Sequence, residues 1–505
     1  MASSLTKDSA STPGAEKTFF GHPRGLATLF LTEMWERFSY YGMRALLVYY
    51  LVSGGADAAT GSQGGGLAMT AAMATAIYSV YVSMVYLMAM PGGWFGDRVW
   101  GARKTVAIAG FVIMGGHLAL ALPGQAMFFV GLVLVAAGSG LLKANISTMV
   151  GHLYDGPEDP RRDGGFTLFY IGINLGAFVA PFVIGTVGKE HNWHLGFALA
   201  AVGMGLGLLQ FLLGTRHLSP KSNIVPNPLS AEERRTVLLR ITGAVVVLAV
   251  FYGAVVALGM YTLNWALVPL TLAGLIIPVA VLVRIKRDKD LSATEQSKMN
   301  GYIWFFVAAA IFWMIYDQGG STLSLFADSK TADTVFGLGF SATWYQSLNP
   351  LFVMALAPVF AWLWLWLARR NQEPNTIVKF AMGLVAVGAS FFIFIVPMGM
   401  ASDGKVSPMW LVSIYMIQTI GELCLSPVGL SVTTKMAPQK YASQMMGVWF
   451  LAVTAGDCTT GLLSLAGVDL NGIGIIAMEA SLAVAAGVAV FMYRKKVQAL
   501  MGNVH

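Results

Sequence analysis

Apolar stretches of about 20 residues, long enough for a helix to cross a lipid bilayer, recur along the whole chain. Of its 505 residues, 56% are hydrophobic and only 11% are charged. A soluble protein of this length would divide into several domains, and each would need a charged surface that this composition does not supply. A surface that faces lipid needs no charges. The sequence therefore predicts an all-α integral membrane protein.

The apolar stretches follow one another as six, two and six, so we expect fourteen transmembrane helices. Two sets of six with a central connection predict two similar bundles around a site near the bilayer midplane. The two additional helices between them have no predicted role. The expected helices lie at 25–53, 67–97, 102–122, 125–150, 164–188, 192–214, 236–259, 264–285, 297–327, 340–368, 375–397, 407–437, 440–466 and 471–496.

This order divides the chain into five units. A disordered cytoplasmic tail precedes an N-terminal six-helix bundle, a cytoplasmic linker carries the two additional transmembrane helices, and a C-terminal six-helix bundle precedes a second cytoplasmic tail. The first tail is polar and lacks an apolar core, so we do not expect it to be a cleaved signal. The units span 1–23, 24–215, 216–296, 297–497 and 498–505.

The basic residues gather in the loops on one side of the membrane. The net charge of +7 would also suit a nucleic-acid-binding protein. However, the basic clusters at 98–104, 284–289 and 494–496 all fall in segments on the same side of the membrane as the N-terminus. The loops expected on the external side hold only three lysines, Lys189, Lys330 and Lys405. This bias is the positive-inside pattern of membrane proteins. It predicts that both termini are cytoplasmic and gives no reason to expect a nucleic-acid partner.

The loop after the second expected helix carries a glycine-rich motif. Residues 93–104 read GWFGDRVWGARK. The glycines permit close helix packing and a tight turn, and Asp97 is placed to cap or pair near the start of the next helix. A merely basic loop would not explain the glycine and aspartate spacing. The motif resembles the signature of the major facilitator superfamily between its second and third helices, which implies that fold.

Seven ionisable residues lie inside the expected helices. A charge near the middle of a membrane helix costs at least about 2.5–3.5 kcal/mol, so these groups must face one another or a wet cavity. Such residues are functional candidates by default. They are Glu33, Glu36, Arg37, Arg44, Lys143, Asp317 and Glu422.

Most of these charges lie on the first expected helix. Glu33, Arg37, Tyr40 and Arg44 share one face, with Glu36 at its flank. At 1.5 Å per residue the stripe is about 16 Å long, enough to connect a midplane site to a deeper one. Its carboxylates would hold or release a proton as their pairing changes. The alternative is a static ion-pair lattice that only holds helices together.

Other charges sit on opposite halves of the chain. Arg44 belongs to the first bundle, whereas Asp317 and Glu422 belong to the second. An ion pair between bundles can form in one conformation and break in another, as a gate does. Lys143 could compete with Arg37 for a glutamate, although a lysine that snorkels toward the membrane surface would also explain it.

Five motifs together resemble one family of this superfamily. Residues 33–42 match the ExxERFxYYG signature of the proton-dependent oligopeptide transporters, and four further segments are similar to the family's helices 5, 7, 8 and 10. The resemblance covers about residues 20 to 495. It implies a proton-coupled symporter that imports di- and tripeptides, and related peptidomimetics, across a bacterial inner membrane. The four further segments are 166–176, 312–319, 346–350 and 421–429.

The resemblance also implies roles for individual residues. The proton-coupling group comprises Glu33, Glu36, Arg37, Lys143 and Asp317. Arg44 would receive the peptide carboxylate and pair with Asp317 across an extracellular gate, and Glu422 would receive the amino terminus. These charges, with amides that both donate and accept, suit a zwitterionic peptide. The remaining binding candidates are Asn174, Asn349, Ser426 and the aromatic residues Tyr40, Tyr78, Tyr81, Trp313 and Trp449, of which the two tryptophans could instead serve packing.

Several alternatives remain open at this stage. Some plant relatives in this family carry nitrate or glycosides, but they often lack part of the ExxER motif. A peptide sensor that does not transport would need no gate charges. The two cysteines, Cys424 and Cys458, lie in apolar stretches, and no metal-ligand spacing or nucleophile–base arrangement indicates an enzyme or a cofactor. Animal members of the family place a histidine in the second helix, and none falls within 67–97 here, which implies that coupling rests on carboxylates. Animal members also insert a large domain between the ninth and tenth helices of the family, so the short connection at 398–408 favours a microbial protein.

Overall fold

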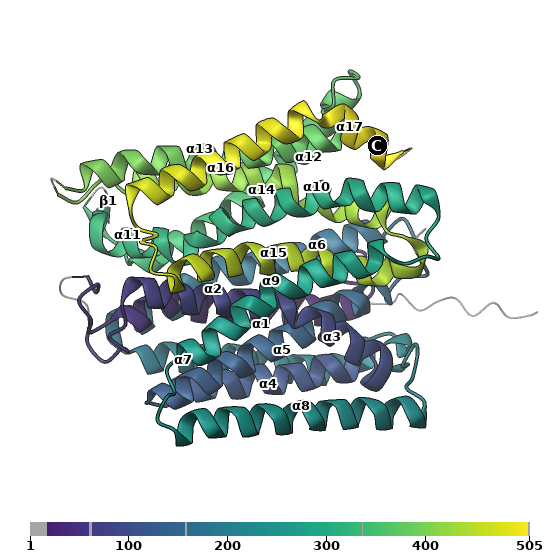
Figure 1. The fold of residues 1–505 in the computed structure, drawn as a ribbon, viewed down its shortest axis with the longest axis horizontal. Helices are drawn as coiled ribbons and strands as arrows, with labels where there is room; N and C mark the ends of the chain where they lie inside the picture. Colours follow the sequence, from purple (N-terminus) through teal and green to yellow (C-terminus); the bar gives the residue numbers. More distant parts are fainter. Residues whose placement is uncertain (1–17, 60–62, 157–158, 336, 403, 503–505) are drawn as a thin grey trace, which may run out of the picture.

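The computed structural model describes residues 18–59, 63–156, 159–335, 337–402 and 404–502. Most of these residues are helical, and the strands among them are one short antiparallel pair, β1 (Thr334–Val335) and β2 (Leu338–Gly339). The start of α1 (Gly25–Val52) and α17 (Arg494–Met501) lie at the same end of the molecule (Figure 1), which we call the near end. The far end is the opposite one, where α1 finishes and α2 (Ala71–Leu87) begins.

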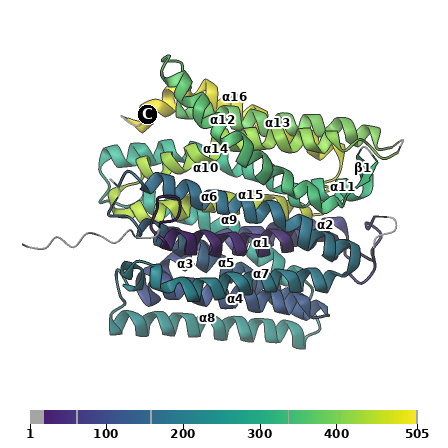
Figure 2. The ribbon, with the colours of Figure 1, turned by 180° about the vertical axis from the view of Figure 1, so that it is seen from behind.

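The helices form two bundles, which are stacked in Figures 1 and 2. After α1 and α2, the first bundle contains α3 (Ala89–Phe95), α4 (Ala102–Ala121), α5 (Gln125–Gly151), α6 (Arg162–Ala180) and α7 (Trp193–Gly214). The second contains α10 (Ala293–Tyr316), α11 (Thr322–Lys330), α12 (Leu348–Ala368), α13 (Thr376–Met400), α14 (Met409–Met436), α15 (Ala442–Leu465), α16 (Ile473–Met492) and α17 (Arg494–Met501). Between them come α8 (Ala231–Ala257) and α9 (Asn264–Lys286).

Shorter helical turns join or extend these helices. Three are π-helical: η1 (Gly96–Trp100), η2 (Pro181–Gly185) and η3 (Val187–His191). The others are 3₁₀ turns: η4 (Thr215–His217), η5 (Pro220–Asn223), η6 (Asp317–Gly320), η7 (Ala342–Ser347) and η8 (Gln439–Tyr441).

The number of membrane-spanning helices agrees with the sequence. Within the described residues, thirteen helical segments are long and apolar enough to cross a membrane. α1 has 28 residues but carries four charged side chains, and most of its residues are buried. With α1 included, the predicted order of six, two and six is confirmed. The four charged side chains of α1 thus lie on a helix that the rest of the protein encloses.

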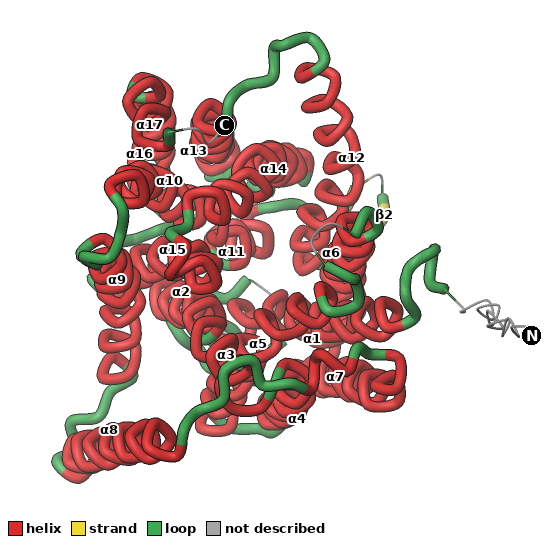
Figure 3. The backbone as a smooth tube through the Cα atoms, turned by 90° about the vertical axis from the view of Figure 1, so that its right-hand side faces the viewer, coloured by secondary structure: helices red, strands yellow, loops and turns green. Residues whose placement is uncertain are grey.

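The most extensive helix contacts between the two bundles are those of α2 with α15 and of α6 with α12. The additional helix α9 packs on both α2 and α15, so it touches both bundles. α8 lies at the edge of the molecule (Figure 3), and Val255 is its one buried residue in the described chain. Its apolar surface is what a helix facing lipid requires.

The glycine-rich loop motif packs helices and holds the linker. A methyl group added at Gly92 would lie 2.4 Å from the carbonyl oxygen of Gly140, so α3 and α5 approach closely at that point. α4 begins without a side-chain cap, so the expected capping role of Asp97 is not seen. Instead, the Asp97 carbonyl accepts a hydrogen bond from the backbone of Asn227 in the linker.

Ion pairs at the near end tie the linker to both bundles. Arg98 contacts Glu233 at 2.8 Å, and Lys440 contacts Asp288 at 2.7 Å. Hydrogen bonds from Lys440 and Tyr441 hold the pKa of the Asp288 carboxyl group below its usual range. These contacts are solvent-exposed, so they position the linker more than they stabilise the fold.

Parts of both predicted tails are ordered. Residues 1–17 and 503–505 lie outside the described residues. Phe19 and His22, however, form a tight turn, and the His22 ring contacts the Tyr154 hydroxyl at 3.1 Å. At the other end, α17 buries Met501, and Ser297 donates a hydrogen bond to the backbone at residue 500. The C-terminal bundle therefore continues beyond residue 497.

The expected helix at 297–327 is broken in the middle. It is composed of α10, the 3₁₀ turn η6 and α11. Gly319 and Gly320 lie in the break, and glycine is unfavourable inside a helix. The break places Asp317 at a helix end, directly opposite α1.

Candidate functional site

Three charged residues of α1 form a buried cluster. The Arg37 Nε atom lies 2.7 Å from Glu33 Oε1 and 3.0 Å from Glu36 Oε2. Glu36 also accepts a hydrogen bond of 2.9 Å from Ser139 of α5. Glu36 is completely buried and Glu33 is 2% exposed. Two carboxyl groups thus share one guanidinium in a site that water does not reach.

Lys143 lies near this cluster but does not pair with it. Its ammonium stands 3.7 Å from the centre of the Tyr86 ring and 4.7 Å from that of Phe450. Among the described residues it forms no ion pair, so the expected competition with Arg37 is not seen in this conformation. It points between α2 and α15 rather than toward the membrane surface, which disagrees with snorkelling. Because Tyr86 and Phe450 belong to different bundles, Lys143 contacts both.

Arg44 joins the two bundles. One of its nitrogens lies 2.9 Å from Asp317 Oδ1, and its Nε donates a hydrogen bond of 2.5 Å to the Tyr78 hydroxyl. The sequence places Arg44 and Asp317 in different bundles, and the structure brings them into contact. A methyl group at Gly320 would lie 1.9 Å from the same Tyr78 hydroxyl, so this junction has no spare room.

Glu422 is held by neighbours within the second bundle. Its Oε2 accepts hydrogen bonds of 2.6 Å from Tyr316 and 2.9 Å from Asn349. Asn349 also donates to Thr419 at 3.1 Å. Asn174, which the family resemblance groups with Glu422, donates instead to the Tyr170 carbonyl of its own helix. One predicted amide therefore contacts Glu422 here and the other does not.

The aromatic candidates occupy two kinds of environment. Tyr40 and Tyr81 stack with ring centres 6.3 Å apart. The Trp313 indole nitrogen is buried, and no residue that the structure describes accepts a hydrogen bond from it. Trp449 packs inside the second bundle, where a methyl group at Gly429 would lie 2.0 Å from its ring. Its surroundings are those of a core residue. Ser426 is partly buried, beside the helix-interior proline at 427.

Sequence reasoning missed several polar groups. Asp457 of α15 is 2% exposed, and its buried Oδ2 has no hydrogen-bond partner among the described residues. Glu479 of α16 is fully buried and accepts hydrogen bonds of 3.0 and 2.9 Å from Gln318. Both are single acids within expected membrane helices, so the rule that selected the other seven charges could have found them. Nothing in the sequence indicates that Tyr316, which donates a hydrogen bond to Glu422, belongs to the site.

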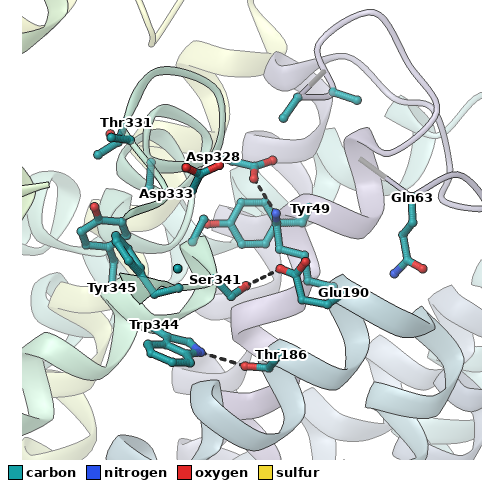
Figure 4. Close-up of a pocket in the computed structure, with 18 of the residues that line it drawn as sticks. Tyr49, Gln63, Thr186, Glu190, Asp328, Thr331, Asp333, Ser341, Trp344 and Tyr345 are labelled. Carbon is teal, nitrogen blue, oxygen red and sulfur yellow. Dashed lines mark hydrogen bonds and ion pairs between the residues drawn. The ribbon is translucent and has the colours of Figure 1, made fainter. Parts of the chain in front are cut away.

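The far ends of the two bundles are joined by a belt of polar contacts (Figure 4). Lys189 contacts Asp328 at 2.6 Å, Ser341 donates to Glu190 at 2.8 Å, and Trp344 donates to Thr186 at 2.8 Å. These contacts surround a cavity of about 720 Å³ that also includes Tyr49 and Tyr345. None of the seven charges predicted from the sequence lines this cavity, so it is distinct from the Arg44 and Glu422 sites.

Comparison with known proteins shows which family the chain resembles in sequence and fold. A profile of the POT family matches residues 103–468. The chain is 40% identical over 498 residues to a di-/tripeptide transporter of Lactococcus lactis subsp. cremoris, covering 97% of this chain and 98% of that one. It is 45% identical over 444 residues to the uncharacterized transporter YclF of Bacillus subtilis (strain 168), covering 88% and 87%. The crystal structure of a peptide transporter POT in complex with sulfate aligns with a TM-score of 0.91 at 43% identity, covering 96% and 97%.

Two six-helix bundles with charged residues paired across their interface define a membrane transporter of the major facilitator superfamily fold. Within that class, the chain belongs to the POT family, the proton-dependent oligopeptide transporters. The family resemblance seen in the sequence is confirmed. The roles of individual residues stay predictions.

The crowding at Gly320 yields a test of the bundle junction. Gly320→Ala would force Tyr78 or η6 to move and so weaken the contacts of Arg44. Overpacking of this kind costs about 1–3 kcal/mol, which would raise the fraction of molecules with separated far ends at least about fivefold. Spin labels at Ala56 and Leu338, both exposed at the far end, measure that separation by their distance distribution.

Gly319→Ala is the matched control, because its added methyl group would lie 3.4 Å from the Tyr415 ring, an ordinary contact. We expect the control to keep the distances of the unchanged protein. Equal distance changes in both variants, or none in either, would contradict the account of this junction.

Proposed function

We propose that this protein is a proton-coupled symporter that imports di- and tripeptides by alternating access. The observation that carries the proposal is the charged stripe of α1. One end of the stripe holds the Glu33, Glu36 and Arg37 cluster, and the other end holds Arg44, which pairs across the bundle interface with Asp317. A single helix thus links a group that can bind protons to a contact that must break when the bundles separate.

The proposed peptide site lies between the bundles. Arg44 offers a planar fork for the peptide carboxylate, and Glu422 offers a counter-charge for the amino terminus. Tyr316 and Asn349 both bond to Oε2 of Glu422, and no described residue donates to its Oε1, which leaves that oxygen for a ligand. The Lactococcus relative is named a di-/tripeptide transporter, which supports the same class of substrate.

Peptide binding and bundle closure would compete for Arg44. In this conformation its guanidinium is engaged by Asp317 and Tyr78. A peptide carboxylate that takes Arg44 must displace at least the ion pair with Asp317. Substrate binding therefore changes the strength of a contact between the bundles, which is what alternating access requires.

Two carboxyl groups of α1 contact a single cation, and protons would act through this excess of carboxyl groups. Glu33 and Glu36 face Arg37 alone, since Lys143 is held by aromatic rings. In a buried site, one of two neighbouring carboxyl groups is favoured to hold a proton. Loss or gain of that proton changes how Arg37 and Lys143 are paired. We propose Glu33, Glu36, Arg37, Lys143 and Asp317 as the coupling group on this basis.

The charge distribution supports an orientation in the membrane. The basic clusters gather at the near end, whereas three lysines, of which Lys189 and Lys405 line the far-end cavity, lie on the other side. We assign the near end, with both termini, to the cytoplasm of a bacterial cell. The belt of contacts at the far end then closes the external side in this conformation.

Transport by the purified protein tests the proposal directly. Reconstituted in proteoliposomes, it should accumulate a labelled dipeptide when an inward proton gradient is imposed, because proton entry drives peptide entry. An uncoupler should abolish the accumulation. Concentrative uptake that persists after uncoupling, without a sodium gradient, would contradict proton symport, and peptide binding without any flux would indicate a sensor.

The role of Glu422 is tested with two ligands. Glu422→Gln removes the proposed counter-charge but retains the hydrogen-bonding capacity of the side chain. A charge-assisted hydrogen bond contributes roughly 1.5–3 kcal/mol, so affinity for a dipeptide with a free amino terminus should fall about 10- to 150-fold. Affinity for the N-acetylated dipeptide, measured by the same competition assay, should change little. Equal losses for both ligands would place the amino group elsewhere.

A further inference from the structure

Glu479 of α16 is a buried acid that has no part in the roles proposed above. None of its surface is exposed, and the side-chain amide of Gln318 donates to both of its carboxyl oxygen atoms, at 3.0 and 2.9 Å. Gln318 belongs to the 3₁₀ turn η6, where it directly follows Asp317. The acid therefore contacts the helix break that carries the partner of Arg44.

The described residues place no cation beside Glu479. It forms no ion pair with them, and Gln318 is its one hydrogen-bond partner. Glu479 lies in the second turn of α16, which begins at the far end. The cations on the helices packed against α16 lie in the first two turns of α10, in the first turn of α13 and in α17, and all three of these segments are at the near end (Figure 1). The charged and titratable groups of these packed elements and of η6 are Glu295, Lys298, Tyr302, Tyr316, Asp317, Lys379, Arg494, Lys495 and Lys496.

These surroundings decide the protonation of Glu479. A buried carboxylate without a counter-charge is strongly disfavoured, and such a group binds a proton and becomes neutral instead. Asp317, the charged group beside its partner Gln318, is itself an acid and disfavours a second negative charge further. A neutral carboxyl group still accepts a hydrogen bond from the Gln318 amide through its carbonyl oxygen. Glu479 is therefore neutral in this site.

Gln318 joins the helices on both sides of the break. Its Nε2 also donates to the Met314 carbonyl at 3.2 Å, in the last turn of α10, and its Oε1 accepts a hydrogen bond of 3.0 Å from Thr322, the first residue of α11. The amide can make all these bonds in one orientation only, with its nitrogen toward Glu479 and its oxygen toward Thr322. The carboxyl group of Glu479 thus orients the side chain that spans the break.

We propose that Glu479 is a positioning residue, a neutral acid that orients Gln318 and so keeps η6 in the conformation that presents Asp317 to Arg44. It acts on the contact between the bundles through Gln318, and it carries none of the protons that drive transport. Glu33 and Glu36 differ from it in this respect, because they share a cation whose pairing a proton can change.

The inference rests on the proposed function only in treating the contact of Arg44 with Asp317 as a gate. Its tests measure protonation and conformation without any peptide. Failure of dipeptide uptake would therefore overturn the proposed function and leave the assignment of Glu479 standing, whereas the experiments below decide that assignment alone.

Infrared spectroscopy of the lipid-reconstituted protein tests the bound proton. The unchanged protein should show, at neutral pH, a carbonyl stretch of a protonated carboxyl group that is absent in Glu479→Gln. Because the group is buried without a cation, this band should persist up to about pH 8. Spectra of the unchanged protein and of Glu479→Gln that do not differ in this band would show an ionised Glu479 and overturn the proposal.

The distance between labels at Ala56 and Leu338 tests the positioning role. Glu479→Leu leaves the Gln318 amide without its acceptor, so the fraction with separated far ends should rise at least about fivefold. Glu479→Gln keeps a neutral side chain with a carbonyl acceptor and should restore the distances of the unchanged protein. A glutamine variant that behaves like the leucine variant would contradict the role of a neutral acid.

A double-mutant cycle tests whether Glu479 acts through Gln318. Gln318→Leu should separate the far ends as Glu479→Leu does, and the double variant should exceed the larger single effect by little. Effects that simply multiply would overturn the proposed route. Ser481→Leu, at an exposed position of the same helix, is the matched control and should leave the distances unchanged. Should Glu479→Leu fail to fold, Gln318→Leu decides the positioning role and the infrared band decides the protonation.

Discussion

The structure depends on one constraint, that every charge within a membrane helix must be neutralised inside the protein. A charge that faces lipid costs at least about 2.5–3.5 kcal/mol, and α1 carries four. This explains why α1 is enclosed by other helices and why its charged residues find partners within bonding distance. Glu33 and Glu36 find theirs in Arg37, on the same helix, whereas Arg44 finds its partner in the other bundle.

The location of each partner decides what the charge can do. Arg37 and its glutamates lie on one helix and can stay paired when the bundles move, so we propose that their pairing responds mainly to protons. Arg44 can keep Asp317 only while the bundles are joined, so its balance responds to conformation. Lys143 lies between rings from both bundles and is free to take a different partner when they part. In the proposed mechanism, neutralisation of buried charge links proton occupancy, peptide binding and the position of the bundles.

Much of the fold could be predicted from the sequence, because the length of an apolar stretch directly reports a membrane span. The expected helix at 125–150 corresponds to α5 at Gln125–Gly151. The start of α8 was placed five residues too late, at 236, although Ser230 and Glu233 form a capping box whose spacing is visible in the sequence. The break at η6 was also missed, because the apolar pattern continues across Gly319 and Gly320.

The site could be predicted less completely. Charges in apolar segments are visible in a sequence. Their sign and bundle left Asp317 and Glu422 as possible partners of Arg44, and the family resemblance implied the pairing with Asp317. Which side chains meet depends on how each helix is rotated about its own axis relative to its neighbours. The spacing of apolar residues in the sequence does not specify that rotation. The sequence therefore suggested a glutamate partner for Lys143, which instead contacts aromatic rings, and the buried Asp457 of α15 was overlooked.

The claim that buried carboxyl groups of α1 couple protons to peptide movement is tested most directly by comparing accumulation with exchange in Glu36→Gln proteoliposomes. Glu36 lies two turns of helix, about 12 Å, from Arg44, so the proposed peptide site is left intact. The account predicts that accumulation driven by the proton gradient is lost, while exchange of labelled for unlabelled peptide continues. Full gradient-driven accumulation by this variant would contradict the account and leave the cluster as a static lattice of ion pairs.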